Sequence, residues 1–105
     1  MRNEIRIFKD HYQAQRSLES YVGQGDVKIN WKTFTMIKGD VTVKFSTIDR
    51  ALDHMYGISF TDAWVDVRAP ENVMSYLLSR MRSHCYPVNA PRIFRTEPPK
   101  DLADV

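Results

Sequence analysis

The sequence has little of what several protein classes require. Its one cysteine, Cys85, excludes an internal disulfide and a cysteine-based zinc site, and it favours a reducing, cytoplasmic environment. No window approaches the ~20 consecutive apolar residues of a membrane-spanning helix, and no apolar run follows the first residues as it does in a secretion signal. We therefore expect a protein that is neither secreted nor inserted in a membrane.

The chain also lacks a strong excess of either sign of charge, because it has fifteen Lys and Arg and thirteen Asp and Glu. Its net charge is therefore only +2. The segment 68–100 is more basic, with six basic residues against two acidic ones. This excess makes a local basic surface a candidate for phosphate or partner contacts. The candidate contact residues are Arg68, Arg80, Arg82, Arg92 and Arg95. The three histidines are not spaced like metal ligands, so no metal site is expected.

The composition, 43% hydrophobic and 27% charged, is that of one globular domain. A domain of this length can bury a modest core without disulfide support. We expect a single α/β domain over residues 1–100. A loose polar tail is expected over 101–105, because Pro98 ends the last β-prone run and the few residues beyond the last element of a domain are seldom tied down.

The first third of the chain predicts a strand followed by a helix. The β-prone run 5–8 stops before Asp10, which together with Gln13 has the form of a capping box. Gly23 lies where the residue after a helix often takes a left-handed conformation. The helix should bury the residues that share one face at the helical period, which are Ala14, Leu18, Tyr21 and Val22.

Two further β-prone runs, 33–37 and 41–45, flank the turn sequence Gly39-Asp40 and predict a hairpin. One face of this hairpin should be apolar and the other polar, because hydrophobic residues alternate with threonine and lysine. The pairs expected opposite each other on the apolar face are Phe34 with Phe45 and Met36 with Val43.

The second half of the chain centres on the apolar run 63–67, which predicts a buried strand. A short helix capped by Ser46 or Thr47 should precede it. Pro70 suits the first position of the helix that follows. The apolar face of this later helix carries Val73, Leu77 and Met81. Asp66 stands at the carboxyl end of the buried strand, where open α/β sheets bind ligands, and is therefore the first candidate site residue.

Four segments of the chain, taken together, form a recognisable pattern. They are Gly39–Phe45, Tyr56–Phe60, Val65-Asp66 and Tyr76–Ser83. Together they resemble the central part of the ATPase domain of phage large terminases, the P-loop motors that package viral DNA. The resemblance covers residues 4–98 and implies a small, partial P-loop-like sheet with a β-hairpin and three helices. It implies that Asp66 is a remnant of the Walker B aspartate, which orders the magnesium shell in that family. It also implies a phage protein of the host cytoplasm linked to DNA packaging.

The chain departs from this family at the residues that ATP chemistry needs. Val67 stands where a glutamate would orient the attacking water, and a valine can neither accept a proton nor hold a water. The chain has no Gly-x-x-x-x-Gly-Lys-Ser/Thr, so it supplies no phosphate loop. Glu97 replaces the usual asparagine of the coupling motif. We therefore expect no catalytic residue, no cofactor and no ATPase activity.

The resemblance further implies that strands at 92–96, 63–67 and 5–8 lie side by side, with the run 92–96 at the outer edge. An unpaired edge strand is a template for another chain, and Ile93 and Phe94 keep this one apolar. We expect the edge to pair with a second copy or with a larger partner. The expected function is thus a non-catalytic protein-binding or regulatory module, dimeric when purified.

Two alternatives stay open at this point. The order of elements is also that of ferredoxin-like α+β folds, as in RNA-recognition domains, although Asp40 and Thr42 stand where such domains need stacking rings. The alternative function is a nucleic-acid-binding module that uses the basic C-terminal half, RNA-recognition-like or terminase-derived. Trp31 is assigned to the core or, if exposed, to a partner contact.

Overall fold

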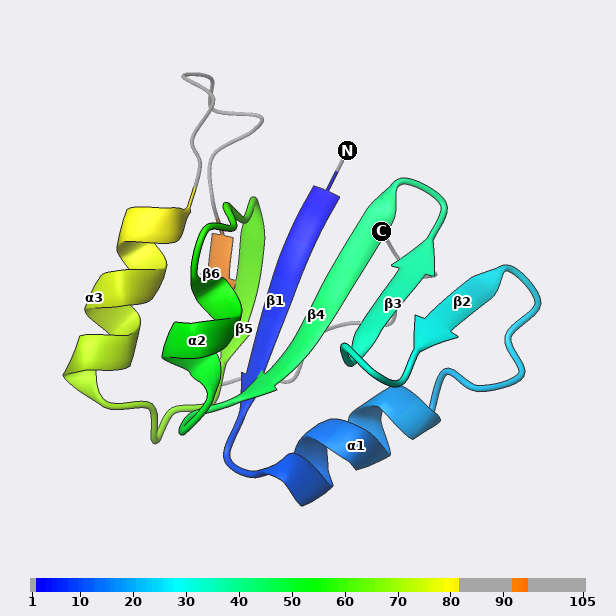
Figure 1. The fold of residues 1–105 in the computed structure, drawn as a ribbon, viewed down its shortest axis with the longest axis horizontal. Helices are drawn as coiled ribbons and strands as arrows, with labels where there is room; N and C mark the ends of the chain where they lie inside the picture. Colours follow the sequence, from blue (N-terminus) through cyan, green and yellow to red (C-terminus); the bar gives the residue numbers. More distant parts are fainter. Residues whose placement is uncertain (1, 82–91, 95–105) are drawn as a thin grey trace.

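The computed structural model describes residues 2–81 and the backbone of residues 92–94. These residues form one six-stranded mixed sheet and three helices (Figure 1), which confirms the predicted α/β class. The strands are β1 (Arg2–Phe8), β2 (Val27–Asn30), β3 (Thr35–Lys38), β4 (Val41–Thr47), β5 (Asp62–Val65) and β6 (Arg92–Phe94). The helices are α1 (His11–Glu19), α2 (Ala51–Met55) and α3 (Glu71–Arg80). The predicted tail, 101–105, lies outside the described residues.

The strands lie in the order β2-β3-β4-β1-β5-β6, so the first strand of the chain is central. β1 pairs in parallel with both β4 and β5, and β5 pairs in parallel with β6. The expected neighbourhood of β6, β5 and β1 is therefore confirmed. The ferredoxin-like alternative is wrong, because sheets of that fold are predominantly antiparallel, whereas β1 has a parallel neighbour on each side.

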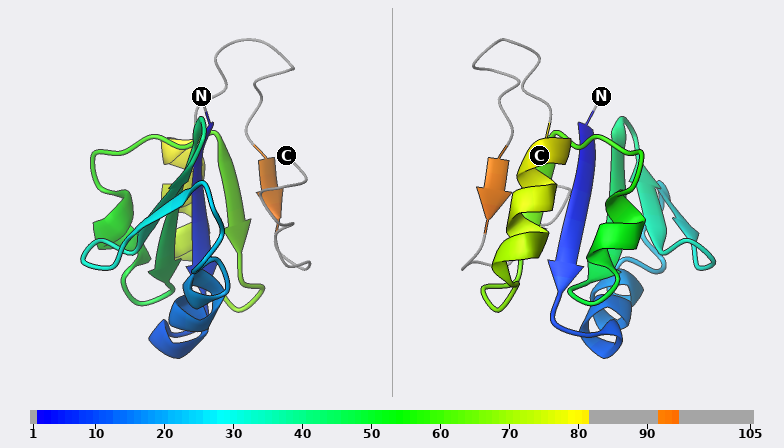
Figure 2. Two further views of the ribbon diagram at one scale, coloured as in Figure 1. Left: turned by 90° about the vertical axis from the view of Figure 1, so that its right-hand side faces the viewer. Right: turned by 60° about the vertical axis from the view of Figure 1, so that its left-hand side comes forward.

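The core has two parts, one on each face of the sheet. Ile5 and Ile7 of β1 pack with α2 and α3, whereas Phe8 packs with α1 and with Phe45 of β4. This division follows from the alternation of side chains along a strand. Figure 2 shows α2 and α3 together on one face.

Helix α1 begins as predicted, because the Asp10 carboxylate accepts a hydrogen bond of 2.9 Å from the backbone N–H of Gln13. Three of the four residues expected on the apolar face are buried. Val22 is instead 59% exposed, so that part of the prediction is wrong. The helix ends at Glu19, and the following turn, with Gly23 at a φ of +91°, directs Val22 away from the core.

The predicted hairpin forms, with Met36 opposite Val43, but it belongs to a larger meander because β2 pairs with β3. Strand β2 was not predicted, because its four residues are too few to show a clear alternation of apolar and polar side chains. Phe34 does not pair with Phe45 as a strand residue: it lies before β3 with a φ of +52°. Its carbonyl nevertheless accepts a hydrogen bond of 2.8 Å from the backbone N–H of Phe45.

The predicted caps of the short helix are wrong. Ser46 and Thr47 are the last residues of β4, because parallel pairing with β1 continues as far as Phe8 and Thr47. Helix α2 begins at Ala51, after Arg50, and has no side-chain cap. In the later helix, Pro70 is the cap residue rather than the first helical residue, and Val73 and Leu77 are buried as predicted.

Strand β1 carries a buried ionic network that sequence analysis did not identify. Arg6 is 1% exposed, its Nε donates to the Glu4 carboxylate, and its Nη1 donates to the Tyr21 hydroxyl over 2.9 Å. The Arg6 guanidinium also lies 5.5 Å from the centre of the Phe45 ring. Glu4 is further paired with Arg2, which in turn contacts the Asp62 carboxylate. The network therefore joins β1, β5 and the end of α1.

Candidate functional site

Three parallel strands, β1, β4 and β5, end at the same edge of the sheet. The segments after them contain charged residues: Lys9 and Asp10 after β1, Asp49 and Arg50 after β4, and Asp66 and Arg68 after β5. Ligands of open α/β sheets bind beyond this carboxyl edge. The edge is therefore the part of the molecule in which a site is expected.

Asp66, the predicted site residue, directly follows β5 and is buried. Its Oδ1 accepts hydrogen bonds from the backbone N–H and the Nε of Arg68, at 2.9 and 2.8 Å. Its Oδ2 accepts from Nη2 of the same arginine at 2.7 Å. The side-chain hydrogen bond from Arg68 lowers the pKa of the Asp66 carboxyl, against the opposing effect of burial. Both oxygens of the carboxylate are thus occupied by one neighbouring residue.

This arrangement leaves Asp66 poorly suited to a metal ion. A divalent cation would need the carboxylate oxygens that already accept hydrogen bonds from the guanidinium, and it would lie close to that positive charge. The next residue, Val67, is exposed and offers no ligand atom on its side chain. Within residues 2–81, no group of three His, Cys, Asp or Glu is placed to hold a metal ion.

The predicted arginines do not form a single surface in the described part of the chain. Arg68 precedes α3 and Arg80 ends it, so a helix of ten residues separates them. Arg80 donates to the Tyr76 hydroxyl at 3.2 Å and stacks over that ring at 5.3 Å. Arg82 and Arg95 lie outside the described residues, and only the backbone of Arg92 is described.

The predicted edge segment is present as β6, which pairs with β5 through Ala63 opposite Ile93 and Trp64 opposite Phe94. Among the strands of the described residues, β6 has β5 as its only neighbour. Strand β2 is the last strand at the opposite end of the sheet. The register places the backbone of Ile93 and Phe94 at the edge of the described sheet, as the family resemblance implied for this run.

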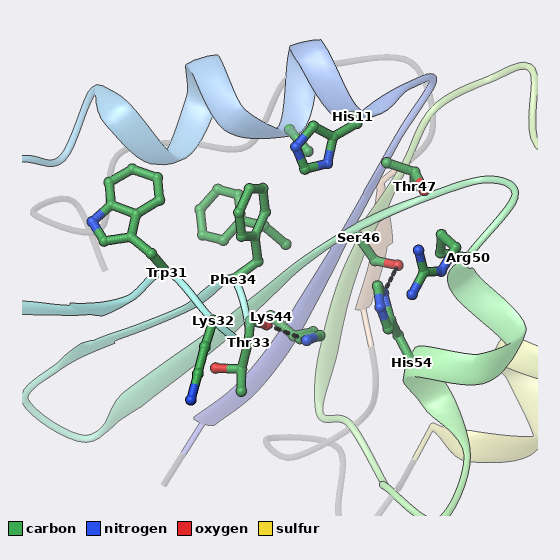
Figure 3. A pocket seen from close by; sticks show the side chains of 12 residues that line it. His11, Trp31, Lys32, Thr33, Phe34, Lys44, Ser46, Thr47, Arg50 and His54 are labelled. Atoms are coloured by element: carbon green, nitrogen blue, oxygen red, sulfur yellow. Dashed lines mark hydrogen bonds between the residues drawn. The ribbon is translucent and has the colours of Figure 1, made fainter.

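Sequence analysis missed a pocket, which we call the basic pocket, beside the last residues of β4 (Figure 3). Its volume is about 280 Å³. The walls come from four parts of the chain. These are helix α1, the segment that precedes β3, strand β4, and helix α2 with the residue before it. The lining residues are His11, Ala14, Trp31, Lys32, Thr33, Phe34, Lys44, Phe45, Ser46, Thr47, Arg50 and His54.

A serine and a histidine meet in the basic pocket. Ser46 Oγ and His54 Nδ1 lie 2.6 Å apart, at hydrogen-bond distance. Burial lowers the pKa of the His54 imidazole, and the positive charges of Lys44 and Arg50 lower it further. In the described part of the chain, no carboxylate is hydrogen-bonded to His54, so the pair lacks the third group that orients the histidine of a catalytic triad.

A second hollow, of about 480 Å³, adjoins the basic pocket and shares His11, Thr47 and Arg50 with it. It lies between the segment after β1 and the segment after β4. The chain then continues into α1, which packs on one face of the sheet, and into α2, which packs on the other. Such a divergence between neighbouring parallel strands is the position at which open sheets bind ligands.

The described residues contain no helix long and apolar enough to cross a membrane. Comparison of the chain with protein-family models, with curated proteins and with solved structures finds no match. The Asp66–Arg68 pair, the sheet edge and the basic pocket are therefore the features of the molecule that bear on its function.

Proposed function

We propose that the chain is a non-catalytic phage protein with a terminase-like core, and that it acts as a protein-binding or regulatory module linked to DNA packaging. The observation that carries the non-catalytic part is the closed Asp66–Arg68 pair, in which one arginine occupies both carboxylate oxygens. An arginine in this position takes the place that a magnesium ion would need. Val67, beside it, has no group that could orient a water.

The order of the parallel strands supports the terminase-like part of the proposal. The resemblance implies β6, β5 and β1 as neighbours, and these three strands are adjacent and parallel. The order β6-β5-β1 also supports the protein-binding part, since it leaves a short strand at the sheet edge of the described residues. Backbone groups at such an edge can be paired by a strand from another chain.

The purified protein is expected not to hydrolyse ATP in the presence of magnesium. The physical reason is that Asp66 is held by Arg68 and that no residue beside it can activate water. The measurement is phosphate release by the wild-type protein and by Asp66→Ala, with boiled protein as the background. Turnover by the wild type that disappears in Asp66→Ala would contradict the proposal.

The edge strand is expected to mediate self-association. Successive residues of a strand direct their backbone N–H groups to opposite sides, so proline at Ile93 and proline at Phe94 remove donors facing opposite neighbours. One of the two variants should weaken association while the monomer stays folded, and the other should weaken the pairing with β5. Sedimentation equilibrium measures association, and circular dichroism measures folding.

The matched pair Ile93→Pro and Phe94→Pro serves as its own control, because both change one residue of the same strand. A wild-type protein that is monomeric at all concentrations, with slow amide exchange across residues 92–94, would show that the edge is not a docking strand. The same would follow if both variants left the association constant unchanged.

A further inference from the structure

The basic pocket collects positive charge without a matching carboxylate. Five of its lining side chains can carry a positive charge, and none of the described residues that line it is Asp or Glu. The five are His11, Lys32, Lys44, Arg50 and His54. Cations gathered in this way repel one another unless an anion lies between them, so the pocket is complementary to a negatively charged ligand.

The guanidinium of Arg50 is available to such a ligand. Every other arginine side chain within residues 2–81 is hydrogen-bonded to a carboxylate or to a tyrosine hydroxyl. Arg50 is exposed, and its guanidinium makes no side-chain hydrogen bond or ion pair within residues 2–81, although its charge helps to lower the pKa of the adjacent Asp49 carboxyl. The neighbouring Asp49 carboxylate accepts a hydrogen bond of 2.7 Å from Thr47 Oγ1 instead. Arg50 thus presents a free, planar set of donors, which suits the paired oxygens of a phosphate.

Lys44 and His54 line the pocket with Arg50, and its charge acts on both of them. Burial lowers the pKa of the Lys44 ammonium, and the charge of Arg50 lowers it further. Burial and the charges of Lys44 and Arg50 also lower the pKa of the His54 imidazole, and these effects exceed the opposing effect of the Asp53 and Asp49 carboxylates. Both shifts reflect burial of a group that carries its positive charge among other cations. An anion in the pocket would relieve this cost, because it favours the protonated form of both groups.

The opposite side of the pocket is aromatic (Figure 3). Trp31 is 45% exposed, and its ring meets that of Phe34 edge to face at a centroid distance of 6.0 Å. Phe34 is in turn stacked with His11 at 4.9 Å. A large ring that is backed by a second ring and open to solvent can stack with a base.

The segment that presents Trp31 is held in an unusual conformation. Phe34 has a φ of +52°, in the left-handed region that bulky residues rarely occupy. The Asn30 side chain fixes the segment by accepting hydrogen bonds from the backbone N–H groups of Lys32 and Thr33, at 3.0 and 3.3 Å. The Lys44 ammonium donates to the Thr33 carbonyl. Strain kept in place by such bonds is typical of ligand-binding segments, and here the segment presents Trp31 on the side of the pocket opposite Arg50 and His54 (Figure 3).

We propose that the basic pocket binds a nucleoside phosphate, with the phosphate on Arg50, Lys44 and His54 and the base stacked on Trp31. The ligand is either a free mononucleotide or the phosphorylated end of a single strand, since both present the same groups. The volume of about 280 Å³ is close to the lower end of the range for small-molecule sites and suits one nucleotide. This site is separate from the edge strand β6 and does not depend on the protein-binding role.

The test measures the binding of four ligands by isothermal titration calorimetry at low salt: inorganic phosphate, adenosine, AMP and a 5′-phosphorylated oligoadenylate. AMP should bind more tightly than phosphate or adenosine, because it alone among these three contacts both sides of the pocket. Equal affinity for AMP and the oligoadenylate identifies a free nucleotide as the ligand. Markedly tighter binding of the oligoadenylate identifies the end of a strand.

Two variants separate the two halves of the site. Arg50→Gln should weaken AMP binding about tenfold or more, because it removes a charge-assisted pair of hydrogen bonds. Trp31→Ala should weaken AMP binding about fivefold or more and leave the affinity for inorganic phosphate unchanged. Arg16→Gln is the matched control, since Arg16 is an exposed arginine of α1 that does not line the pocket.

The proposal fails if neither AMP nor the oligoadenylate shows saturable binding. It also fails if Arg50→Gln and Arg16→Gln bind equally well, or if phosphate alone binds as tightly as AMP. Circular dichroism of each variant verifies that the fold is retained, and both substituted side chains are exposed, so folding should not be affected. Loss of self-association in the β6 variants bears only on the protein-binding role.

Discussion

Replacing Arg6 by alanine is expected to lower the free energy of unfolding by about 3–5 kcal/mol, the usual cost of removing one partner from a buried ion pair. The substitution leaves the buried Glu4 carboxylate with Arg2, a half-buried partner, and removes the donor to the Tyr21 hydroxyl. It also removes the packing of the guanidinium on the Phe45 ring. Urea denaturation followed by circular dichroism measures the loss.

Two variants control for the Arg6 result. Arg16→Ala removes an exposed arginine of α1 and should change stability by no more than about 0.5 kcal/mol. The double variant Glu4→Gln with Arg6→Met neutralises both partners and should recover part of the loss, because no unpaired charge stays buried. A loss below about 1 kcal/mol in Arg6→Ala would show that the network contributes little to stability.

Replacing Phe45 by alanine is expected to destabilise the protein by about 3–5 kcal/mol, because it opens a cavity in the cluster beneath α1. Phe45 is fully buried, and its ring is stacked with Phe8 at 5.9 Å and meets Tyr21 edge to face at 6.3 Å. It also supports the basic pocket, of which it forms part of the wall. The change in unfolding free energy is measured by urea denaturation.

Ile37→Ala is the matched control for Phe45→Ala, since Ile37 belongs to the adjacent strand β3 but is 44% exposed. The free energy of unfolding of Ile37→Ala should fall by only about 0.5 kcal/mol, as for other surface substitutions. Equal losses in the two variants would mean that the cluster beneath α1 does not dominate the stability of this half of the sheet.

The elements that sequence analysis identified are those with strong local signals. The Asp10 cap of α1, the turn at Gly39-Asp40 and the apolar run of β5 each determine structure within a few residues. The missed or misassigned elements depend on partners far away in the sequence. Thr47 resembles a helix cap locally, but it is a strand residue because Phe8 pairs with it across the sheet.

The candidate site residues also differ in whether a local sequence signal reveals them. Asp66 was found because an acidic residue at the end of an apolar run is visible in the sequence. Its partner Arg68 was noted only as a surface charge, because two-residue spacing does not reveal a chelating hydrogen-bond geometry. The basic pocket was missed entirely, since His11, Trp31, Lys44 and Arg50 come from four separate segments and meet only after folding. The assignment of Trp31 to the core is wrong, because Trp31 is 45% exposed, and its role as a partner contact stays a prediction.

The central position of β1 has a consequence for protein synthesis. β1 leaves the ribosome first, yet its neighbour β5 follows far later: Asn3 bonds to Thr61, 58 residues along the chain. At a synthesis rate of about 5–20 residues per second, the first strand waits for about 3–12 s before β5 exists. The other neighbour, β4, is made sooner, because its pairing with β1 begins with Val41 opposite Arg2. The two sides of the central strand are therefore completed at different times, and the side that pairs with β5 is completed last.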